Sequence, residues 1–205
     1  MVQAILAGRK TQTRRVLKLS RYLPSRTEKQ PEVMTVKDLK LYDGNGELQG
    51  NLIMKYGKPG DVLWVRETFM NAPNAELMPE KPFYYKASVS SQFISEWPGY
   101  FNPSIHMPKK ACRLFLKIKD VRIERLQNIS RKDAIAEGST NILKYDDLER
   151  MRGLGNWTIP SPFDEYQFGF LSIWTKINGC ESWLSNPYVW VIEFERIEKP
   201  ENFLS

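Results

Sequence analysis

The segment of residues 8–15 reads Gly-Arg-Lys-Thr-Gln-Thr-Arg-Arg, so two hydroxyl groups alternate with four cations. Side chains of these types can surround an anion or a polar base with hydrogen-bond donors. Lys10 and Thr13 also form a candidate base and nucleophile, because a partly desolvated lysine among cations tends toward the neutral amine and can accept the threonine proton. The residue types alone leave open the alternative of a solvated basic loop.

These cations belong to a strongly basic N-terminal region. Residues 1–40 contain ten Lys or Arg and three acids, whereas the other 165 residues contain twenty bases and twenty-one acids. A basic region of this kind typically attracts nucleic acid, a nucleotide or an anionic surface. A solvated basic face is the alternative.

The composition excludes several other kinds of site. The chain of 205 residues has one histidine, His106, and two cysteines, Cys112 and Cys180, and it lacks HExxH, CxxC and P-loop motifs. These counts argue against a multi-histidine metal site, a thiolate zinc site and a disulfide scaffold, and we expect no metal and no cofactor. His106 is interpreted as a structural residue. No apolar run reaches the roughly 18 residues of a membrane span and no secretory signal is present, so we expect no membrane partner and a cytoplasmic location.

The elements that position the basic segment follow from hydrophobic periodicity and from turn and cap residues. The predicted helices cover residues 1–7, ended by Gly8, residues 130–137, with Ser130 as cap and Gly138 as stop, and the stretch from Ser161-Pro162 to Gly179. The predicted strands cover residues 39–42 and 47–54 around the turn 43–46, residues 61–69 after the turn at Pro59-Gly60, residues 83–87, a long or bent strand in 112–126 with a break at Asp120, and residues 188–197.

Short helices among several strands predict one α+β domain over residues 1–205, built on a small barrel or curled sheet. Polar and proline-containing stretches predict loop insertions near residues 20–35, 70–108 and 139–160.

Two motifs carry a family resemblance. LAGRKTQTRR, followed downstream by PGDVLWVRETF, resembles the ASCH domain, and the SIHMP element and the closing NPYVWVIEF are similar to its phage and prophage branch. This resemblance implies a PUA-like small mixed β-barrel with flanking short helices. It also implies RNA or a modified nucleoside as partner, and a location in the cytoplasm of a bacterial host cell.

Within that family, the segment resembles the ILAGRKTxTxR motif of the N(4)-acetylcytidine amidohydrolases. The resemblance implies a catalytic set of Lys10, Thr13 and Glu137, the glutamate matching through the stretch Ala-Ile-Ala-Glu at 134–137, and it aligns Arg15 with the motif arginine. Thr13 would attack the acyl carbonyl, Lys10 would accept its proton, and Glu137 would orient the base or return the proton to the leaving amine. The three side chains must then lie within hydrogen-bonding reach, roughly 3–4 Å.

The chain departs from that pattern in three respects. Gln12 and Arg14 replace apolar residues of the enzymes, and a charge there favours phosphate contact over a buried wall. The chain is about twice as long as the minimal enzymes of that family. It also begins at the motif helix, where family members have a preceding strand, and a missing strand would leave an open sheet edge.

Further candidates for contact with nucleic acid or substrate surround this set, and we expect the site in a cleft between residues 8–15, 61–67 and 130–138. Asp61 is expected chiefly to close its turn. Arg66 and Glu67 are either an ion pair or ligand contacts, and Tyr188 and Trp183 are candidates to stack on a base. The candidate binding residues are Arg9, Arg14, Arg15, Asp61, Trp64, Arg66, Glu67 and Tyr188.

The sequence therefore predicts a protein that binds RNA or a modified nucleoside, and the family resemblance implies that it hydrolyses the amide of an N(4)-acylated cytidine. Three alternatives remain open. A non-catalytic RNA-binding module would tolerate the loss of Thr13, a ribonuclease would need a metal or an acid–base pair, and a phage assembly role is neither supported nor excluded by the sequence.

Overall fold

The computed structural model describes residues 1–18, 35–37, 40–42, 48–52, 55–72, 82–97, 99–140 and 164–203. The predicted turn at 43–46 and nearly all of the predicted insertions near 20–35 and 139–160 lie outside these residues. Part of the insertion near 70–108 is described and contains its own secondary structure.

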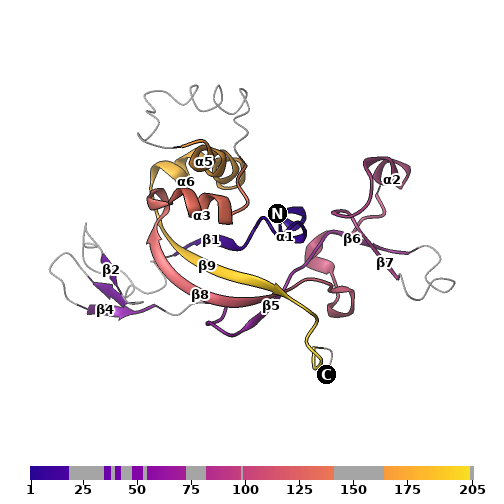
Figure 1. Ribbon diagram of the computed structural model, residues 1–205, viewed down its shortest axis with the longest axis horizontal. Helices are drawn as coiled ribbons and strands as arrows, with labels where there is room; N and C mark the ends of the chain where they lie inside the picture. Colours follow the sequence, from indigo (N-terminus) through magenta and orange to yellow (C-terminus); the bar gives the residue numbers. More distant parts are fainter. Residues whose placement is uncertain are drawn as a thin grey trace, which may run out of the picture.

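A four-stranded antiparallel sheet forms the body of the fold and curls into a half-barrel (Figure 1). Its strand order is β1-β9-β8-β5, with β1 at Gln12–Val16, β9 at Tyr188–Ile197, β8 at Phe115–Arg125 and β5 at Val62–Trp64. The two long strands β8 and β9 pair along their whole length, and their register shifts between Ile118 and Asp120, where the sequence pattern breaks. A bulge of this kind bends a strand, so it contributes to the curl of the sheet.

Three helices pack on one face of the sheet near the start of β9 (Figure 1). They are α3 at Arg131–Ala136, α5 at Glu165–Asn178 and α6 at Cys180–Leu184. Val189 and Val191 of β9 point into this layer, together with Phe170, Trp174 and Trp183 of the helices. The alternate residues Trp190, Ile192 and Phe194 lie in separate buried clusters on the other face, as their spacing predicts.

Local sequence signals determine where these helices begin. The Ser130 hydroxyl accepts a hydrogen bond from the Asp133 amide at the start of α3, as its capping pattern predicts. The cap of α5 is Asp164, which forms a capping box with Gln167. Gly138 and Gly179, which follow the two helices, both have positive φ.

Two smaller strand groups lie at the ends of the half-barrel (Figure 1). The antiparallel strands β2, β3 and β4 form one group, and their pairing confirms the hairpin predicted around the turn 43–46. Strands β6 and β7 form the other group, with helix α2 beside them. The bounds are Thr35–Lys37 for β2, Lys40–Tyr42 for β3, Leu48–Asn51 for β4, Phe69–Asn71 for β6, Phe83–Tyr85 for β7 and Ser91–Glu96 for α2.

The prediction of one continuous strand over residues 61–69 is wrong. β5 ends at Trp64, and β6 begins only at Phe69, where it pairs with β7 instead of β8. In between, the Val65 amide still donates a hydrogen bond to the carbonyl of Leu114, whereas the Glu67 amide donates one to the sulfur of Met107. The chain therefore leaves the half-barrel at this point and enters a separate lobe.

Among the described helices, none is both long and apolar enough to cross a membrane.

Candidate functional site

The first helix and the start of β1 carry the basic segment to the end of α3. Helix α1, at Val2–Leu6, ends as predicted near Gly8, and the Lys10 amide then bonds the carbonyl of Ala4. One residue later, the Thr11 amide bonds the carbonyl of Ala136 at 2.8 Å. Lys10 and Glu137 thereby form an isolated antiparallel bridge, which brings two residues 127 positions apart into direct contact.

Gly138 makes this close approach possible. Its φ is +82°, a conformation that side chains disfavour, and a Cβ atom there would lie 3.2 Å from the Cβ of Lys10 and 3.3 Å from that of Ala4. The residue that stops α3 is thus also the residue that lets α1 and Lys10 pack against the helix end.

The Lys10 amine is buried and bonded to Glu137 twice. Its Nζ donates to the carboxylate Oε2 at 2.5 Å and to the main-chain carbonyl of Glu137 at 2.9 Å, and the two residues are 7% and 8% exposed. Burial lowers the pKa of Lys10 below its ordinary value, and the neighbouring Glu137 carboxylate offsets only part of that effect. Lys10 therefore loses its proton at a lower pH than an exposed lysine does.

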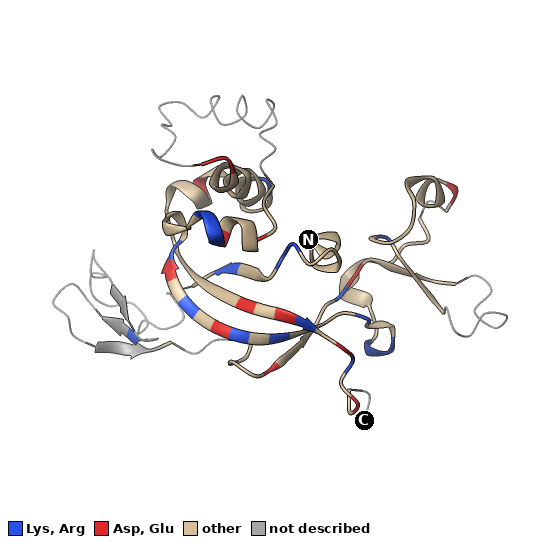
Figure 2. Ribbon diagram, viewed as in Figure 1, with Lys and Arg blue, Asp and Glu red and all other residues tan. Residues whose placement is uncertain are grey.

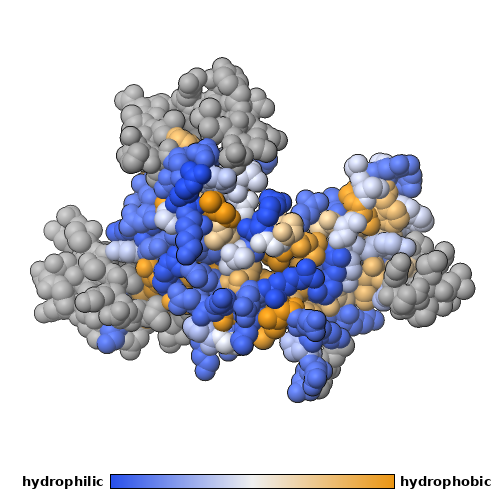
Figure 3. Space-filling model, in the orientation of Figure 1, coloured by the Kyte–Doolittle hydropathy of each residue, from blue (hydrophilic) through white to orange (hydrophobic). Residues whose placement is uncertain are grey.

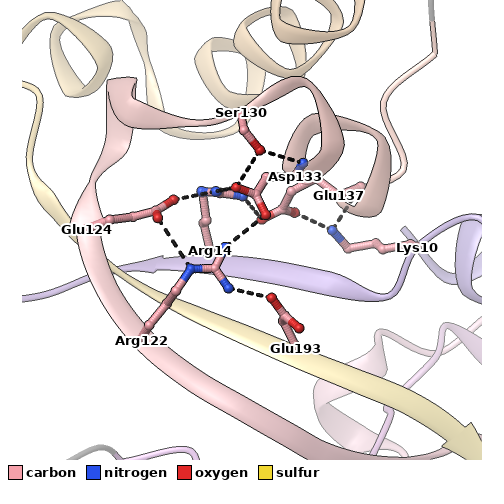
Figure 4. A network of polar contacts seen from close by, with 8 residues as sticks. All are labelled: Lys10, Arg14, Arg122, Glu124, Ser130, Asp133, Glu137 and Glu193. Atoms are coloured by element: carbon pink, nitrogen blue, oxygen red, sulfur yellow. Dashed lines mark hydrogen bonds and ion pairs between the residues drawn. The ribbon is translucent and has the colours of Figure 1, made fainter.

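Arg14 lies beside this pair and holds the other oxygen of Glu137 (Figure 4). Its guanidinium contacts Glu137 Oε1 at 3.3 Å, Glu124 at 2.5 Å and Asp133 at 3.5 Å, and it lies over the ring of Phe170 at 5.5 Å. The side chain is fully buried. We expected Arg14 to contact phosphate rather than a buried wall, but the structure encloses it among three carboxylates of its own chain.

The network continues away from Lys10 through Asp133 and Arg122 (Figure 4). Arg122 contacts Asp133 at 2.8 Å and also bonds Glu124 and Glu193. Burial alone would raise the pKa of Asp133. The Ser130 hydroxyl and the guanidinium groups of Arg14 and Arg122 have the larger, opposite effect, so the pKa of Asp133 is below its ordinary value. Asp133 is therefore held as a carboxylate between two arginines.

A pocket of about 180 Å³ opens beside Lys10, and we call it the lysine pocket. Helix α1, strand β1, the end of α3 and helix α5 surround it. Lys10, Thr13 and Glu137 all line it, and so do the apolar side chains of Phe170, Trp174, Ile173 and Ile177. Its remaining lining residues are Met1, Ala4, Arg14, Arg15, Val16, Gly138 and Asn178.

Thr13 lines the lysine pocket without a hydrogen bond to either partner. It is half-buried in the middle of β1, paired with Ile192, and its hydroxyl makes no hydrogen bond within the described residues. Lys10 and Glu137 thus meet at hydrogen-bonding distance, whereas Thr13 shares their pocket only. Arg15, two positions along the same strand, is exposed at the pocket rim.

The strand that we expected to form one wall of the cleft does not line the pocket. Asp61 closes its turn as predicted, by accepting the Lys58 amide at 2.9 Å. Trp64 is half-buried against Phe203, and Arg66 lies over the Trp64 ring at 4.8 Å. Helix α5 takes the place that the sequence interpretation assigned to residues 61–67.

Of the two interpretations left open for Arg66 and Glu67, an ion pair between them is absent from the described residues. Glu67 is 1% exposed and binds Arg113 instead. The Arg113 guanidinium donates hydrogen bonds to the two carboxylate oxygens of Glu67, at 2.9 and 2.7 Å. Arg66 points to the surface and donates to the carbonyl of Ile105 at 3.0 Å. Adjacent residues of an extended chain point to opposite sides, which separates their side chains.

The remaining candidates lie apart from the lysine pocket. Arg9 is exposed and does not line it. Tyr188 is half-buried at the start of β9, with the Arg125 guanidinium 3.9 Å from the centre of its ring. Trp183 is 1% exposed in the helix layer and offers no face for a base, so that interpretation is wrong.

The sequence interpretation missed the contribution of α5 and the carboxylates around Arg14. Ile173 and Ile177, one turn apart, are 42% and 68% exposed, and apolar residues exposed at this spacing indicate a second face of α5 that leaves the core. The signal for the carboxylates is Arg14 itself, two residues from Gln12 on one side of a strand. A buried arginine requires acidic partners.

Within the described ranges, no group of three or more His, Cys, Asp or Glu side chains is arranged to hold a metal ion. The chain matches no protein-family model, no curated protein and no solved structure. The class that fold and site define is therefore a mixed α+β protein with a curled antiparallel sheet and a buried Lys–Glu pair at a small pocket.

Proposed function

We propose that this chain is a PUA-like ASCH protein that binds a modified nucleoside of RNA and hydrolyses the amide of an N(4)-acylated cytidine. The observation that carries the proposal is that Lys10 and Thr13 of the N-terminal segment and Glu137, which is more than 120 positions away in sequence, line one pocket. The apolar side chains of α5 in the same pocket suit the face of a base and an acyl group.

The chemistry follows from the hydrogen bonds of Lys10. In the neutral amine, both N–H groups are used by the carbonyl and the carboxylate of Glu137, which leaves the nitrogen lone pair for a third partner. Thr13 Oγ1 forms a bond to the acyl carbon, and its proton passes to Lys10 Nζ. The carbon–N4 bond then breaks as a proton reaches N4 through Glu137, giving cytidine and an acyl-threonine. Water hydrolyses that ester, releases the carboxylic acid and restores Thr13.

Arg14 has a positioning role in this mechanism. Its bond to Glu137 Oε1 leaves Oε2 for Lys10, so the carboxylate is held in one orientation.

The test is turnover of N(4)-acetylcytidine, measured as cytidine released over time. We expect the wild type and Thr68→Val to turn over, since Thr68 lines neither the lysine pocket nor its network. We expect Thr13→Val, which keeps the shape of the side chain, to lose activity and the acyl-protein adduct that mass spectrometry would detect in the wild type. A folded wild type that releases no cytidine would contradict the proposal for this substrate.

A binding module without turnover is the second candidate, and the free hydroxyl of Thr13 favours it, because no hydrogen bond yet couples Thr13 to Lys10 within the described residues. In that case Thr13→Val would bind an RNA containing N(4)-acetylcytidine as tightly as the wild type does. Lys10→Met would still weaken binding, because it removes a buried cation from the pocket.

A further inference from the structure

A second cavity of about 590 Å³ lies on the other side of Lys10. It is formed by the end of α1, the start of β1, helix α3, the central part of β8 and the second half of β9, and Lys10 lines both this cavity and the lysine pocket. The mechanism above uses none of its other side chains. We call it the strand cavity.

The inner wall of the strand cavity contains an amide without a hydrogen bond. Gln12 is 1% exposed and lines the cavity, and neither its Oε1 nor its Nε2 has a partner at hydrogen-bond geometry. The amide lies near enough to Asp133 to contribute to the lowered pKa of that carboxyl, but this leaves Oε1 without a donor. A buried amide without a partner is unfavourable, and a ligand that donates to Oε1 would remove that cost.

The rim of the strand cavity is basic. Five cations and three carboxylates line it: Lys10, Lys119, Arg122, Lys132 and Arg196 against Asp133, Glu193 and Glu195. Arg122 is fully engaged by carboxylates, and Lys119 lies 3.8 Å from Glu195. Lys132 and Arg196 are exposed and have no carboxylate partner among the described residues. Charged residues of both signs occur in α3 and follow one another along β8 and in β9 (Figure 2), and hydrophilic residues dominate this part of the surface (Figure 3).

We propose that the strand cavity binds the ribonucleotide next to the modified nucleoside, so that a single-stranded RNA binds more tightly than the free nucleoside does. This inference rests on the proposed function of the lysine pocket. The phosphate lies against Lys132 and Arg196, and a ribose hydroxyl or a base N–H donates to Gln12 Oε1. Because both cavities share Lys10, adjacent nucleotides of one strand occupy them together.

The first experiment compares three probes: the nucleoside N(4)-acetylcytidine, an RNA trinucleotide with N(4)-acetylcytidine at its centre, and the same trinucleotide with cytidine. We expect the wild type to bind the acetylated trinucleotide at least about tenfold more tightly than the nucleoside, the scale of one or two charge-assisted contacts.

The double variant Lys132→Glu with Arg196→Glu should lose this gain and still bind and hydrolyse the nucleoside as the wild type does. The matched control is Lys58→Glu with Lys110→Glu, which makes the same charge change at two lysines that line neither cavity. It should keep the gain. The dependence of log Kd on log salt should fall in the rim variant by about 0.7 for each phosphate that its side chains no longer neutralise.

Gln12→Leu separates ligand binding from a structural role. Because neither amide atom of Gln12 has a partner at hydrogen-bond geometry in the free protein, its replacement by a leucine of similar size should not lower the free energy of unfolding. The affinity for the trinucleotide should nevertheless fall. A loss of stability with unchanged affinity would show that Gln12 is structural and would overturn this part of the proposal.

The outcomes for the two cavities are distinguishable. Hydrolysis of the nucleoside with no tighter binding of the trinucleotide, or with a rim variant that binds it like the wild type, overturns the strand cavity and leaves the proposed function intact. Binding of the cytidine trinucleotide that depends on Lys132 and Arg196, without any hydrolysis, supports the strand cavity and overturns the proposed activity.

Discussion

Two glutamates among the described residues are buried beside cations, and one of them lines the lysine pocket. Glu137 binds Lys10 and Arg14 at the edge of the lysine pocket, and Glu67 binds Arg113 where the chain leaves the half-barrel. Both were candidate site residues in the sequence. Their surroundings differ in ways that separate a chemical role from a structural one.

The carboxylate of Glu67 is closed to further partners. The Arg113 guanidinium donates a hydrogen bond to each carboxylate oxygen of Glu67, and it lies 3.9 Å from the centre of the Tyr85 ring. The main-chain amide of Glu67 donates a hydrogen bond to the sulfur of Met107. Arginine is not deprotonated in proteins, so this pair has no proton to exchange. It ties the β6–β7 lobe to the segment that leads into β8.

The carboxylate of Glu137 is shared between unlike cations. Arg14 fixes one oxygen, and the other faces a lysine whose pKa is lowered by burial. A lysine that loses its proton readily, beside an open pocket, can accept one from a substrate or a nucleophile. The contrast indicates that the kind of cation, and access to it, determine whether a buried carboxylate can take part in chemistry.

The largest expected effect is on catalysis and uses a matched pair of substitutions. Glu137→Gln should lower kcat/KM for N(4)-acetylcytidine by about 10²- to 10⁴-fold, because the amide cannot pass a proton to the leaving amine. Glu67→Gln should leave kcat/KM of the folded protein within about threefold of the wild type, since that effect on the barrier stays below about 1 kcal/mol. Steady-state kinetics at a temperature where both variants are folded would measure this. Equal losses in the two variants would remove the distinction.

The next effect is on stability and concerns the surroundings of Glu67. Arg113→Met leaves the Glu67 carboxylate buried without a charge partner, which should lower the free energy of unfolding by about 3 to 5 kcal/mol. Arg66→Met, at the surface arginine next to Glu67 in sequence, is its control and should cost much less. Urea unfolding followed by tryptophan fluorescence measures both changes. A small cost for Arg113→Met would mean that Glu67 has other support.

The contrast also separates what the sequence could predict from what it could not. The cap at Ser130, the stop at Gly138 and the extent of β9 depend on neighbouring residues and on a simple alternation, and the structure confirms them. The break at Asp120 marks the register shift of β8 for the same reason. Local chemistry determines such features before the chain folds.

The partners of the buried charges depend on contacts between distant segments. Glu67 meets Arg113 across 46 residues, whereas adjacency in sequence offered Arg66 as one of two interpretations. Arg14 meets Glu124 across 110 residues, so its burial could not be anticipated from the basic composition of its own segment. The wall formed by α5 was likewise unforeseen, because its periodicity indicates a core helix without saying what its exposed turn faces.

A third prediction uses pH to test the difference between the two cations. The lowered pKa of Lys10 means that the folded protein loses this proton at a lower pH than the unfolded chain does. As pH rises from the folded value toward 10.5, only the unfolded chain still holds the proton, so the stability of the wild type should rise in that window. Lys10→Met should lack this rise, whereas Lys58→Met, at an exposed lysine, should retain it.

Chemical unfolding at a series of pH values provides the measurement, with activity as a second readout. If Lys10 accepts the Thr13 proton, kcat/KM should increase over the lower part of the same window, as the neutral amine becomes populated. A wild type whose stability matches that of Lys10→Met at every pH would show that burial does not shift the titration of Lys10.

The smallest effect concerns Arg66, the residue next to Glu67 in sequence. Its guanidinium lies over the Trp64 ring at 4.8 Å and donates to the Ile105 carbonyl, both at the exposed surface. Exposed contacts of this kind contribute about 0.5 to 1 kcal/mol, so Arg66→Ala should lower the free energy of unfolding by no more than that. The same urea unfolding would detect it. A loss as large as that of Arg113→Met would mean that Arg66 stabilises the lobe through the SIHMP segment, and that Glu67 is not its only tie to the half-barrel.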